Sequence, residues 1–219
     1  MFGRDPCYVI DPGPDIDEHL EALVREVGAR GGAAAILVTH DHRDHIEGAA
    51  PLRERLGAPL VAPRADADER PSDGGAIGPL TAVATPGHAS EHYAFVAGGA
   101  CFAGDLVLGV GSVFVPGERG ALAAYLASLE RLRSLPLDLI APGHGPLVTD
   151  PARRLDECRE HRLERERALV AALADGVRDH DELLDRVWAD APAALRGAAA
   201  STLAAHLAKL ADEGRLPAA

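Results

Sequence analysis

The ten residues from Thr39 to Gly48, THDHRDHIEG, decide how this sequence is interpreted. They follow the apolar run Ala33–Thr39, which predicts a buried strand, and they lead into the helical pattern of Ile46–Leu56. Three histidines and two aspartates therefore stand in one loop between a strand and a helix. Loops held by a rigid scaffold often carry catalytic and binding side chains, so this segment is the first candidate for a functional site.

The spacing within this segment suits a site for two metal ions. Alternation in an extended loop puts His40 and His42 on the same side. Asp44 and His45, at the turn into the helix, can point to a second ion a few ångströms away. Imidazole and carboxylate groups suit zinc and its first-row neighbours. The alternative, a set of solvated loop residues, requires the His-x-His-x-Asp-His pattern to arise by chance, so we predict a metal site.

Further candidate ligands stand at the ends of other predicted strands. His88 and His144 each follow a Pro-Gly pair at the end of an apolar run, and Asp105 follows Gly104 in the same situation. Strand ends in open α/β sheets are where ligands gather, and a glycine beside a ligand lets the backbone approach a metal without a Cβ clash. Each of the three alone would more often be a turn residue. Together with the first segment they predict one shared metal centre.

The first 150 residues alternate short apolar runs with helical patterns, which is typical of the α/β class. The strands are apolar throughout, which indicates a sheet covered on both faces. Strands are predicted at Ala33–Thr39, Leu80–Thr85, Tyr93–Val96, Ala100–Ala103 and Leu137–Ala141, and helices at Ile16–Val27, Ile46–Leu56 and Leu122–Ser134.

The character of the sequence changes at Pro151, so residues 1–150 and residues 151–219 are predicted to form two domains. The second part has helical periodicity, and His206 falls on the apolar face of its last helix. This pattern predicts a small helical, winged-helix-like domain. Its expected elements are helices at Ala152–Ala174, Asp181–Trp188 and Ala193–Glu213, and a strand beginning within Glu213–Leu216.

The composition favours a cytoplasmic protein with an acidic surface. The net charge is −12, and residues 1–150 contribute −10 of it, with 11 Lys and Arg against 21 Asp and Glu, which disfavours a generic polyanion binder. No apolar stretch reaches membrane-spanning length, and the N-terminus lacks a signal-peptide pattern. The three cysteines lie far apart without Cys-x-x-Cys spacing, which favours neither a disulfide framework nor a cysteine metal site.

Together these motifs resemble the metallo-β-lactamase superfamily, which also includes glyoxalase II and tRNA 3′-processing nucleases. The resemblance covers essentially the whole chain and implies a four-layer αββα sandwich. It also implies two divalent metal ions, Zn²⁺ before Mn²⁺ or Fe²⁺. Carried over residue by residue, it makes His40, His42 and His88 the ligands of the first metal, Asp44, His45 and His144 the ligands of the second, and Asp105 the bridge between them.

The arrangement beyond the ligands resembles the β-lactamase-like-protein-2 subgroup. Its members add a C-terminal winged-helix domain, which 192–216 would match here, and some are metal-dependent endoribonucleases. Relatives usually carry two strands before the stretch that matches 9–13, whereas this chain has only about eight residues there, so its N-terminal strands are expected to be shortened. The segments that carry the narrower resemblance are TPGHASEH at 85–92, GDLVLG at 104–109, YLASLERL at 125–132 and APGHGP at 141–146.

The ligand set disfavours some relatives. Common true lactamases place Cys where this chain has Asp105, and flavodiiron oxidoreductases place Glu where it has His42. The implied function is a hydrolase that uses a metal-bound hydroxide on an ester, thioester or similar bond. The alternative is an endoribonuclease of single-stranded RNA, for which Arg196, Lys209 and eight aromatic residues are thin support. A non-catalytic binding module would be expected to have lost ligands, and none is lost.

The resemblance gives Asp44 a catalytic role besides metal binding, in which it accepts a hydrogen bond from the hydroxide and orients it. The partner is expected to be a small ester or thioester, or single-stranded RNA, and no membrane. Metal ligands set the reaction type while loops set specificity, so the loops at 65–78 and 109–120 are predicted to form the walls of the substrate pocket.

Two residues near the predicted ligands have open roles. Asp11, in Asp-Pro-Gly-Pro, is favoured as a turn former, and the alternative is a group behind the ligands that steadies the 40–45 loop. His92, four residues after His88, is favoured as a buried, hydrogen-bonded histidine. Its alternative is an acid on the substrate side of the site.

Overall fold

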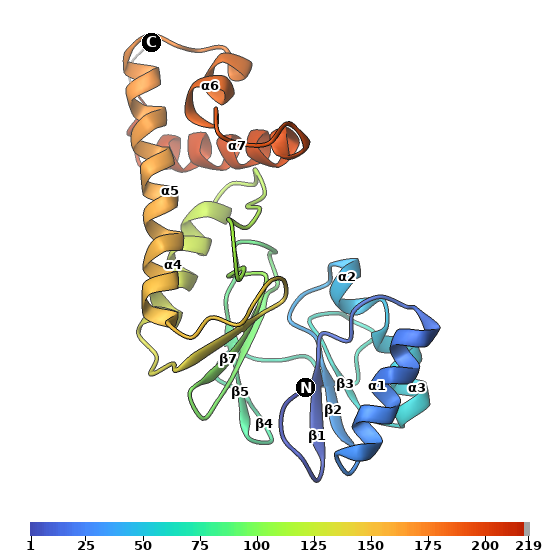
Figure 1. The fold of residues 1–219 in the computed structure, drawn as a ribbon. Helices are drawn as coiled ribbons and strands as arrows, with labels where there is room; N and C mark the ends of the chain where they lie inside the picture. The colour runs from blue at the N-terminus through green and yellow to red at the C-terminus, as the bar shows by residue number, and fades with distance from the viewer. Residues whose placement is uncertain (217–219) are drawn as a thin grey trace.

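The computed structural model of the chain describes residues 1–216. Two β-sheets face each other in the first two thirds of the chain, and helices cover the outer face of each (Figure 1). Buried apolar side chains meet between the sheets, among them Leu37 and Val61 from one and Leu80 and Phe95 from the other. This is the αββα sandwich that the resemblance to the metallo-β-lactamase superfamily implied, and it shields both faces of each sheet from water.

The first sheet has three parallel strands in the order β1 (Cys7–Ile10), β2 (Ala33–Leu37) and β3 (Leu60–Val61). Its outer face is covered by α1 (Asp17–Ala29) and α3 (Ala49–Leu56), which share a buried apolar cluster with the strands. A parallel pair requires a crossover connection, and α1 provides it between β1 and β2. The connection from β2 to β3 contains the histidine-rich segment, so the end of β2 fixes where that segment begins.

The second sheet has five strands, covered on its outer face by α4 (Ala121–Arg133) and α5 (Pro151–Ala174). Neighbouring strands are antiparallel from β4 to β7, whereas β7 and β8 are parallel. It follows that β5, β7 and β8 run in one direction and end at the same edge of the sheet. The strands are β4 (Ala76–Ile77), β5 (Leu80–Ala84), β6 (Tyr93–Ala97), β7 (Ala100–Gly104) and β8 (Leu139–Pro142).

The predicted strands are all present, with ends within two residues of those expected. Three further strands, β1, β3 and β4, were not among the predicted ones; β3 and β4 have two residues each, which are too few to show an alternating pattern. The helix expected at Ile46–Leu56 ends where predicted but begins later: α3 starts at Ala49, and Glu47–Gly48 separate it from the short helix α2 (Arg43–Ile46). Within the described residues, the stretch before β1 contributes only a bridge between Phe2 and Tyr8.

The C-terminal part is helical and packs around its own apolar cluster, which includes Leu169, Trp188 and Leu203. The strand expected from Glu213 is not formed in the part of the chain that the structure describes, where the last helix gives way to a turn; residues 217–219, where a wing would continue, lie outside it. None of the described helices is long and apolar enough to cross a membrane. The elements after α5 are α6 (His180–Val187), a 3-10 turn (Ala193–Leu195) and α7 (Arg196–Asp212).

His206 on α7 is a buried histidine without hydrogen-bonded neighbours. Its side chain is fully buried, and neither ring nitrogen has a hydrogen-bond partner among the described residues. Burial, and then the positive charge of Arg162, lower the pKa of His206 from 6.5 to about 4, while the nearby carboxylate of Glu166 opposes the shift. The folded chain therefore keeps His206 neutral at a pH where an unfolded chain would protonate it.

Because of His206, the free energy of unfolding is expected to decrease as the pH is lowered. Between pH 7 and pH 5 the unfolded state takes up the proton that the folded state refuses, which removes about 2 kcal/mol of unfolding free energy. In His206→Leu this contribution is absent, so denaturant unfolding at the two pH values should show a correspondingly smaller difference than in the wild type. An unchanged difference would contradict the buried, neutral state of His206.

Candidate metal centre

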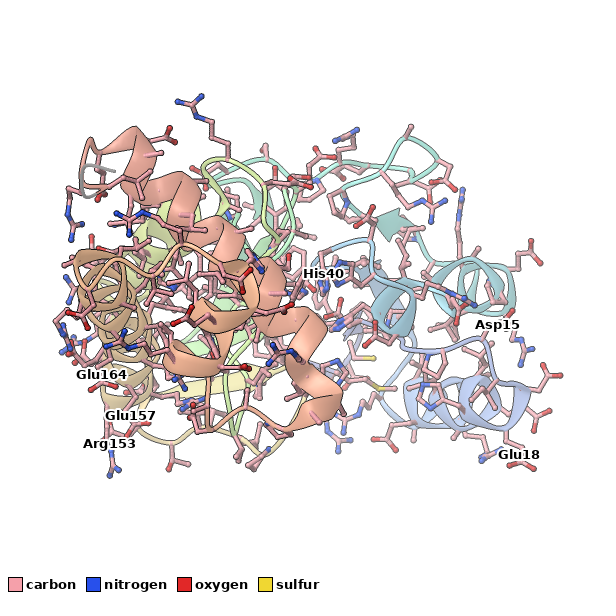
Figure 2. The ribbon with its side chains drawn as sticks, turned by 90° about the horizontal axis from the view of Figure 1, so that it is seen from above. Asp15, Glu18, His40, Arg153, Glu157 and Glu164 are labelled. Carbon is pink, nitrogen blue, oxygen red and sulfur yellow. The ribbon has the colours of Figure 1, made fainter. Side chains whose placement is uncertain are left out.

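The candidate ligands come from the ends of four strands. β2 leads to His40, while β5, β7 and β8 end shortly before His88, Asp105 and His144 respectively. Because the last three strands end at one edge of the second sheet, their loops meet the loop after β2 at the top of the sandwich. Figure 2, which looks down on this end, places His40 at the junction between the two halves of the molecule. The fold thus brings segments far apart in sequence to one place.

All seven predicted ligands lie in this cluster. Within it, Nε2 of His88 lies 3.0 Å from Nδ1 of His42, and Nε2 of His144 lies 3.0 Å from Oδ2 of Asp44. Three sets of side chains have ligand atoms within 4.8 Å of one another, close enough to surround a metal ion. The sets are His40, His42 and His88; His40, His45 and Asp105; and Asp44, His45 and His144.

Asp105 lies between the other ligands. Its Oδ1 is 3.5 Å from Nε2 of His45, and its Oδ2 is 3.8 Å from Nε2 of His88 and 3.6 Å from Nε2 of His144. His88 belongs to one set of ligands, and His45 and His144 belong to another. One carboxylate therefore reaches both sets.

Several buried polar atoms in the cluster fit a bound cation. Nε2 of His40, Nε2 of His45 and Oδ1 of Asp105 are buried and have no hydrogen-bond partner in the described structure. Buried polar atoms are normally satisfied, so these three require a partner, and metal ions would supply it. The backbone leaves room for it, because a Cβ on Gly143 would stand 2.5 Å from Asp105 Oδ1 and from His45 Cε1. The residues present thus fit a metal centre.

The protonation of the histidines also fits metal binding. Burial and the neighbouring histidines lower the pKa of His40, and burial lowers the pKa of His88, so both are neutral near pH 7 and offer a lone pair. His45 differs: against the effect of burial, the nearby carboxylates of Asp105 and Asp11 raise its pKa to about 10. In a metal-free chain His45 therefore carries a proton between carboxylates, in a place that a metal cation can take.

Asp11 holds the histidine loop from behind. Its Oδ1 accepts a hydrogen bond from the backbone N–H of Thr39, and its Oδ2 accepts one from the Thr39 hydroxyl, both at 2.8 Å. Oδ2 also lies 2.8 Å from Nδ1 of His45. The backbone of Asp11 has a φ of 47°, in the left-handed region, but residues 11–13 form no hydrogen-bonded turn in the described structure. The geometry therefore favours the alternative role, in which Asp11 orients His45 toward the cluster.

Replacing Asp11 by Ala is expected to weaken metal binding about 10- to 100-fold, because His45 loses the partner that fixes its ring orientation. Competition with a chromophoric chelator measures the affinity. Asp15→Ala is the matched control, since Asp15 is exposed and lies away from the cluster (Figure 2). Equal affinity in Asp11→Ala and the control would show that these hydrogen bonds do not position the ligand.

His92 lies behind the ligands and is 1% exposed. Its Nδ1 lies 2.8 Å from the hydroxyl of Thr85, and its ring centroid is 5.0 Å from that of His40. Burial and the charge of His88 lower the pKa of His92 to about 3, so the ring is neutral. This geometry fits the favoured interpretation, a buried and hydrogen-bonded histidine, and not an acid that faces the substrate.

Two contributors to the site were missed from the sequence. The hydroxyl of Thr39 lies 2.9 Å from Nδ1 of His40, and the carbonyl oxygen of Phe114 accepts a hydrogen bond from Nδ1 of His88 at 2.8 Å. Both contacts fix the ring of a ligand. Thr39 could have been considered because it precedes the first histidine, whereas a backbone carbonyl 26 residues away from its partner leaves no signal in the sequence.

Comparison with known families gives matches over most of the chain. Residues 7–84 match the beta-lactamase superfamily domain, and residues 68–144 match the metallo-beta-lactamase superfamily. Residues 180–216 match the beta-lactamase associated winged helix domain. The second match ends at the last of the candidate ligands, His144.

Comparison with individual proteins also gives matches to members of this superfamily. A beta-lactamase-like protein 2 homolog of Caenorhabditis elegans is 29% identical to this chain over 94% of it and 75% of that protein. A hydroxyacylglutathione hydrolase of Thiobacillus denitrificans is 35% identical over 77% of this chain and 68% of its own length. The crystal structure of a metallo-beta-lactamase family protein from Thermus thermophilus has a TM-score of 0.77 at 25% identity, covering 98% of this chain and 87% of that chain. The chain therefore belongs to the metallo-β-lactamase superfamily, as a hydrolase with an associated winged-helix domain.

Proposed function

We propose that this hydrolase uses two divalent metal ions, with zinc as the first choice, to cleave an ester or thioester bond in a small substrate. The observation that carries the proposal is the position of Asp105, whose carboxylate oxygens lie 3.5 to 3.8 Å from histidines of both ligand sets. A carboxylate in this position can bridge two cations about 3.5–4 Å apart. The buried atoms without partners on His40 and His45 support the same arrangement.

The seven ligands divide between two ions in this proposal. Bound cations would supply a nucleophilic water near neutral pH and polarise the scissile group. The hydrogen bonds that Asp11 accepts from the loop and the one that His88 donates to the Phe114 carbonyl hold the ligand rings in place before any metal arrives. The first ion is assigned to His40, His42 and His88, the second to Asp44, His45 and His144, and Asp105 contacts both.

Asp44 is placed to act on the attacking water. Its side chain is 58% exposed and that of His144 is 51% exposed, whereas His45 is buried, so the Asp44 side of the cluster is open to solvent. A substrate can approach from this side. We assign to the Asp44 carboxylate the role of accepting a hydrogen bond from the water and directing its lone pair at the scissile bond.

A small substrate is favoured over RNA by the charges of the C-terminal helices. Arg196 pairs with Asp185 at 2.5 Å, and Lys209 pairs with Glu166 at 2.8 Å, so the two basic residues of α7 are neutralised by acids of this chain. Phosphate binding depends on cations that are free to replace counterions. The relative named hydroxyacylglutathione hydrolase acts, by its name, on an acyl derivative of a small thiol.

A substrate panel tests the proposal against the endoribonuclease alternative. The metal-loaded protein is assayed with acyl-glutathione and S-acyl-N-acetylcysteamine thioesters and with a fluorescently labelled single-stranded RNA. We expect thioester hydrolysis that a chelator abolishes and Zn²⁺ or Mn²⁺ restores, and no cleavage of the RNA. Asp105→Ala, purified in the same way, controls for contaminating enzymes. Chelator-sensitive cleavage of RNA alone would overturn the proposal in favour of the nuclease.

A further inference from the structure

A cavity of about 370 Å³ lies between the loop after β7 and the C-terminal helices. Val113 and Phe114 of the loop line it, together with Arg162 of α5 and Ala198 of α7. Loop 109–120 is one of the two that the sequence predicted as a wall of the substrate pocket. Residues of loop 109–120 and of the C-terminal helices thus line one cavity together.

Arg162 is the unusual residue of this cavity. Its side chain is 3% exposed, its guanidinium donates a hydrogen bond to the carbonyl of Val113, and it lies 5.3 Å from the centroid of the Tyr125 ring. Its Nε has no hydrogen-bond partner, and no carboxylate of residues 1–216 is within ion-pair distance. A buried charge without a counterion is costly, so this position favours an anion from outside the chain.

The other charged groups of the cavity neutralise one another. Arg165 pairs with Asp190 at 2.6 Å and also donates to the carbonyl of Val187. Burial, and then the charges of the neighbouring arginines, lower the pKa of His161, whose Nδ1 lies 3.3 Å from the Ser112 hydroxyl. The cavity therefore offers one net positive charge, on Arg162, among apolar walls.

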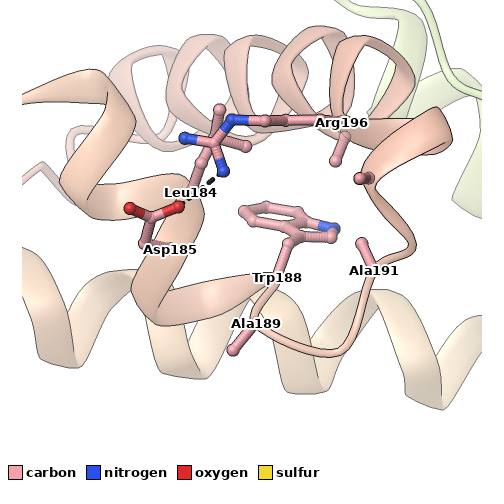
Figure 3. Close-up of a pocket in the computed structure, with 8 residues that line it drawn as sticks. Leu184, Asp185, Trp188, Ala189, Ala191 and Arg196 are labelled. Carbon is pink, nitrogen blue, oxygen red and sulfur yellow. Dashed lines mark hydrogen bonds and ion pairs between the residues drawn. The ribbon is translucent and has the colours of Figure 1, made fainter.

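A neighbouring pocket differs from this cavity in the pairing of its charged residues. Trp188 lines both this cavity and a second one of about 350 Å³, which Figure 3 shows. There the charged lining residues, Asp185 and Arg196, are paired with each other at 2.5 Å. That pocket has no unbalanced charge for a ligand to satisfy, whereas the cavity at Arg162 does.

The cavity adjoins the metal centre through one residue. Phe114 lines the cavity, its carbonyl accepts the hydrogen bond from His88, and its ring centroid lies 6.3 Å from that of His88. A molecule that fills the cavity therefore lies directly beyond a ligand of the first metal site.

We propose that this cavity binds the acyl part of the substrate and that Arg162 receives a carboxylate at the far end of that acyl chain. The inference rests on the proposed hydrolysis of small thioesters and specifies their class: thioesters of apolar acids with a second, terminal carboxylate. One unpaired guanidinium among apolar walls suits a monoanion, while a nucleic acid would require several free cations. The overall charge of −12 also opposes a polyanion.

A matched pair of substrates tests the inference. S-glutaryl-N-acetylcysteamine carries the terminal carboxylate, and its carbamoyl analogue has an uncharged amide in the same place. We expect kcat/KM for the carboxylate to exceed that for the amide by about tenfold or more, chiefly through KM, because a charge-assisted hydrogen bond is lost in the amide. A ratio near one in the wild type would overturn the inference.

Variants of residues that line the cavity test whether the preference for the carboxylate substrate arises there. Arg162→Gln removes the cation and should bring the ratio of the two kcat/KM values close to one. Ala198→Leu keeps the cation, fills the cavity from α7 and should reduce the same ratio even if Arg162→Gln does not fold. Ala211→Leu is the matched control, since Ala211 is an exposed residue of the same helix outside the cavity and its variant should keep the wild-type ratio.

Thermal unfolding gives a readout that does not depend on hydrolysis. Phenylacetate should raise the midpoint of the wild type and Ala211→Leu, whereas phenylacetamide should not, and both Ala198→Leu and Arg162→Gln should lose the response. If no thioester is hydrolysed but phenylacetate stabilises only the wild type and Ala211→Leu, the proposed reaction is wrong, whereas the binding of an anion in the cavity is supported. If phenylacetate stabilised all variants equally, its carboxylate would be bound by the metals and not by Arg162. If only uridine monophosphate stabilised the protein, the cavity would bind a phosphate. Either result would overturn the inference.

Discussion

Replacing Asp105 by Ala is expected to leave about one metal ion or fewer per chain and to lower turnover at least about 1,000-fold. The carboxylate of Asp105 approaches histidines of both ligand sets, at 3.5 to 3.8 Å, so its loss weakens both metal sites at once. Losing a ligand common to two ions also leaves the buried Nε2 of His45 without its nearest carboxylate oxygen. Metal content by mass spectrometry and steady-state hydrolysis measure the two effects.

The control for this variant is Asp138→Ala. Asp138 is an exposed aspartate just before β8 and does not contact the cluster. It should keep its metal content and its activity, while circular dichroism confirms that both variants are folded. A folded Asp105→Ala protein with two metal ions and wild-type turnover would contradict the bridging role.

Replacing Asp44 by Ala is expected to lower kcat about 100- to 10,000-fold, the range for losing a group that handles a proton in the transition state. The effect should exceed the loss of metal, because His45 and His144 remain to hold the second ion and Asp105 still reaches it. Assays at saturating Zn²⁺ separate the two causes.

Asp41→Ala is the matched control for Asp44. Asp41 is exposed, stands three residues earlier in the same segment and belongs to none of the three ligand sets. It should retain near-normal activity. Near-normal activity of Asp44→Ala at saturating metal would instead remove Asp44 from the chemistry and leave it, at most, a dispensable ligand.

Much of the fold could be predicted from the sequence because the longer strands are apolar runs bounded by Gly, Pro or Asp. The break between α2 and α3 at Gly48 could not be predicted in this way. The pattern of Ile46–Leu56 is compatible with one helix, but the N–H of Gly48 donates to the carbonyl of Gly13 at 2.8 Å. A Cβ on Gly48 would also lie 3.0 Å from Leu20. The break between α2 and α3 thus depends on packing against the loop after β1, which local sequence does not reveal.

The candidate ligands could be predicted because both their residue type, histidine or aspartate, and their position at the ends of predicted strands are visible in the sequence. Their supporting contacts could not. Asp11 stands in a sequence that is typical of a turn, yet its carboxylate bonds to Thr39 and His45, which are about 30 residues away. The lack of a counterion for Arg162 is likewise a property of the assembled core, since several acidic residues stand near it in the sequence.

The central claim, a site for two metal ions, is tested most directly by the metal content of the purified full-length chain. Inductively coupled plasma mass spectrometry, after dialysis against metal-free buffer and again after incubation with Zn²⁺ or Mn²⁺, gives the number of ions per chain. We expect about two ions per chain in the wild type and in Asp138→Ala, and about one or fewer in Asp105→Ala. No bound metal, and none acquired on adding zinc or manganese, would contradict it.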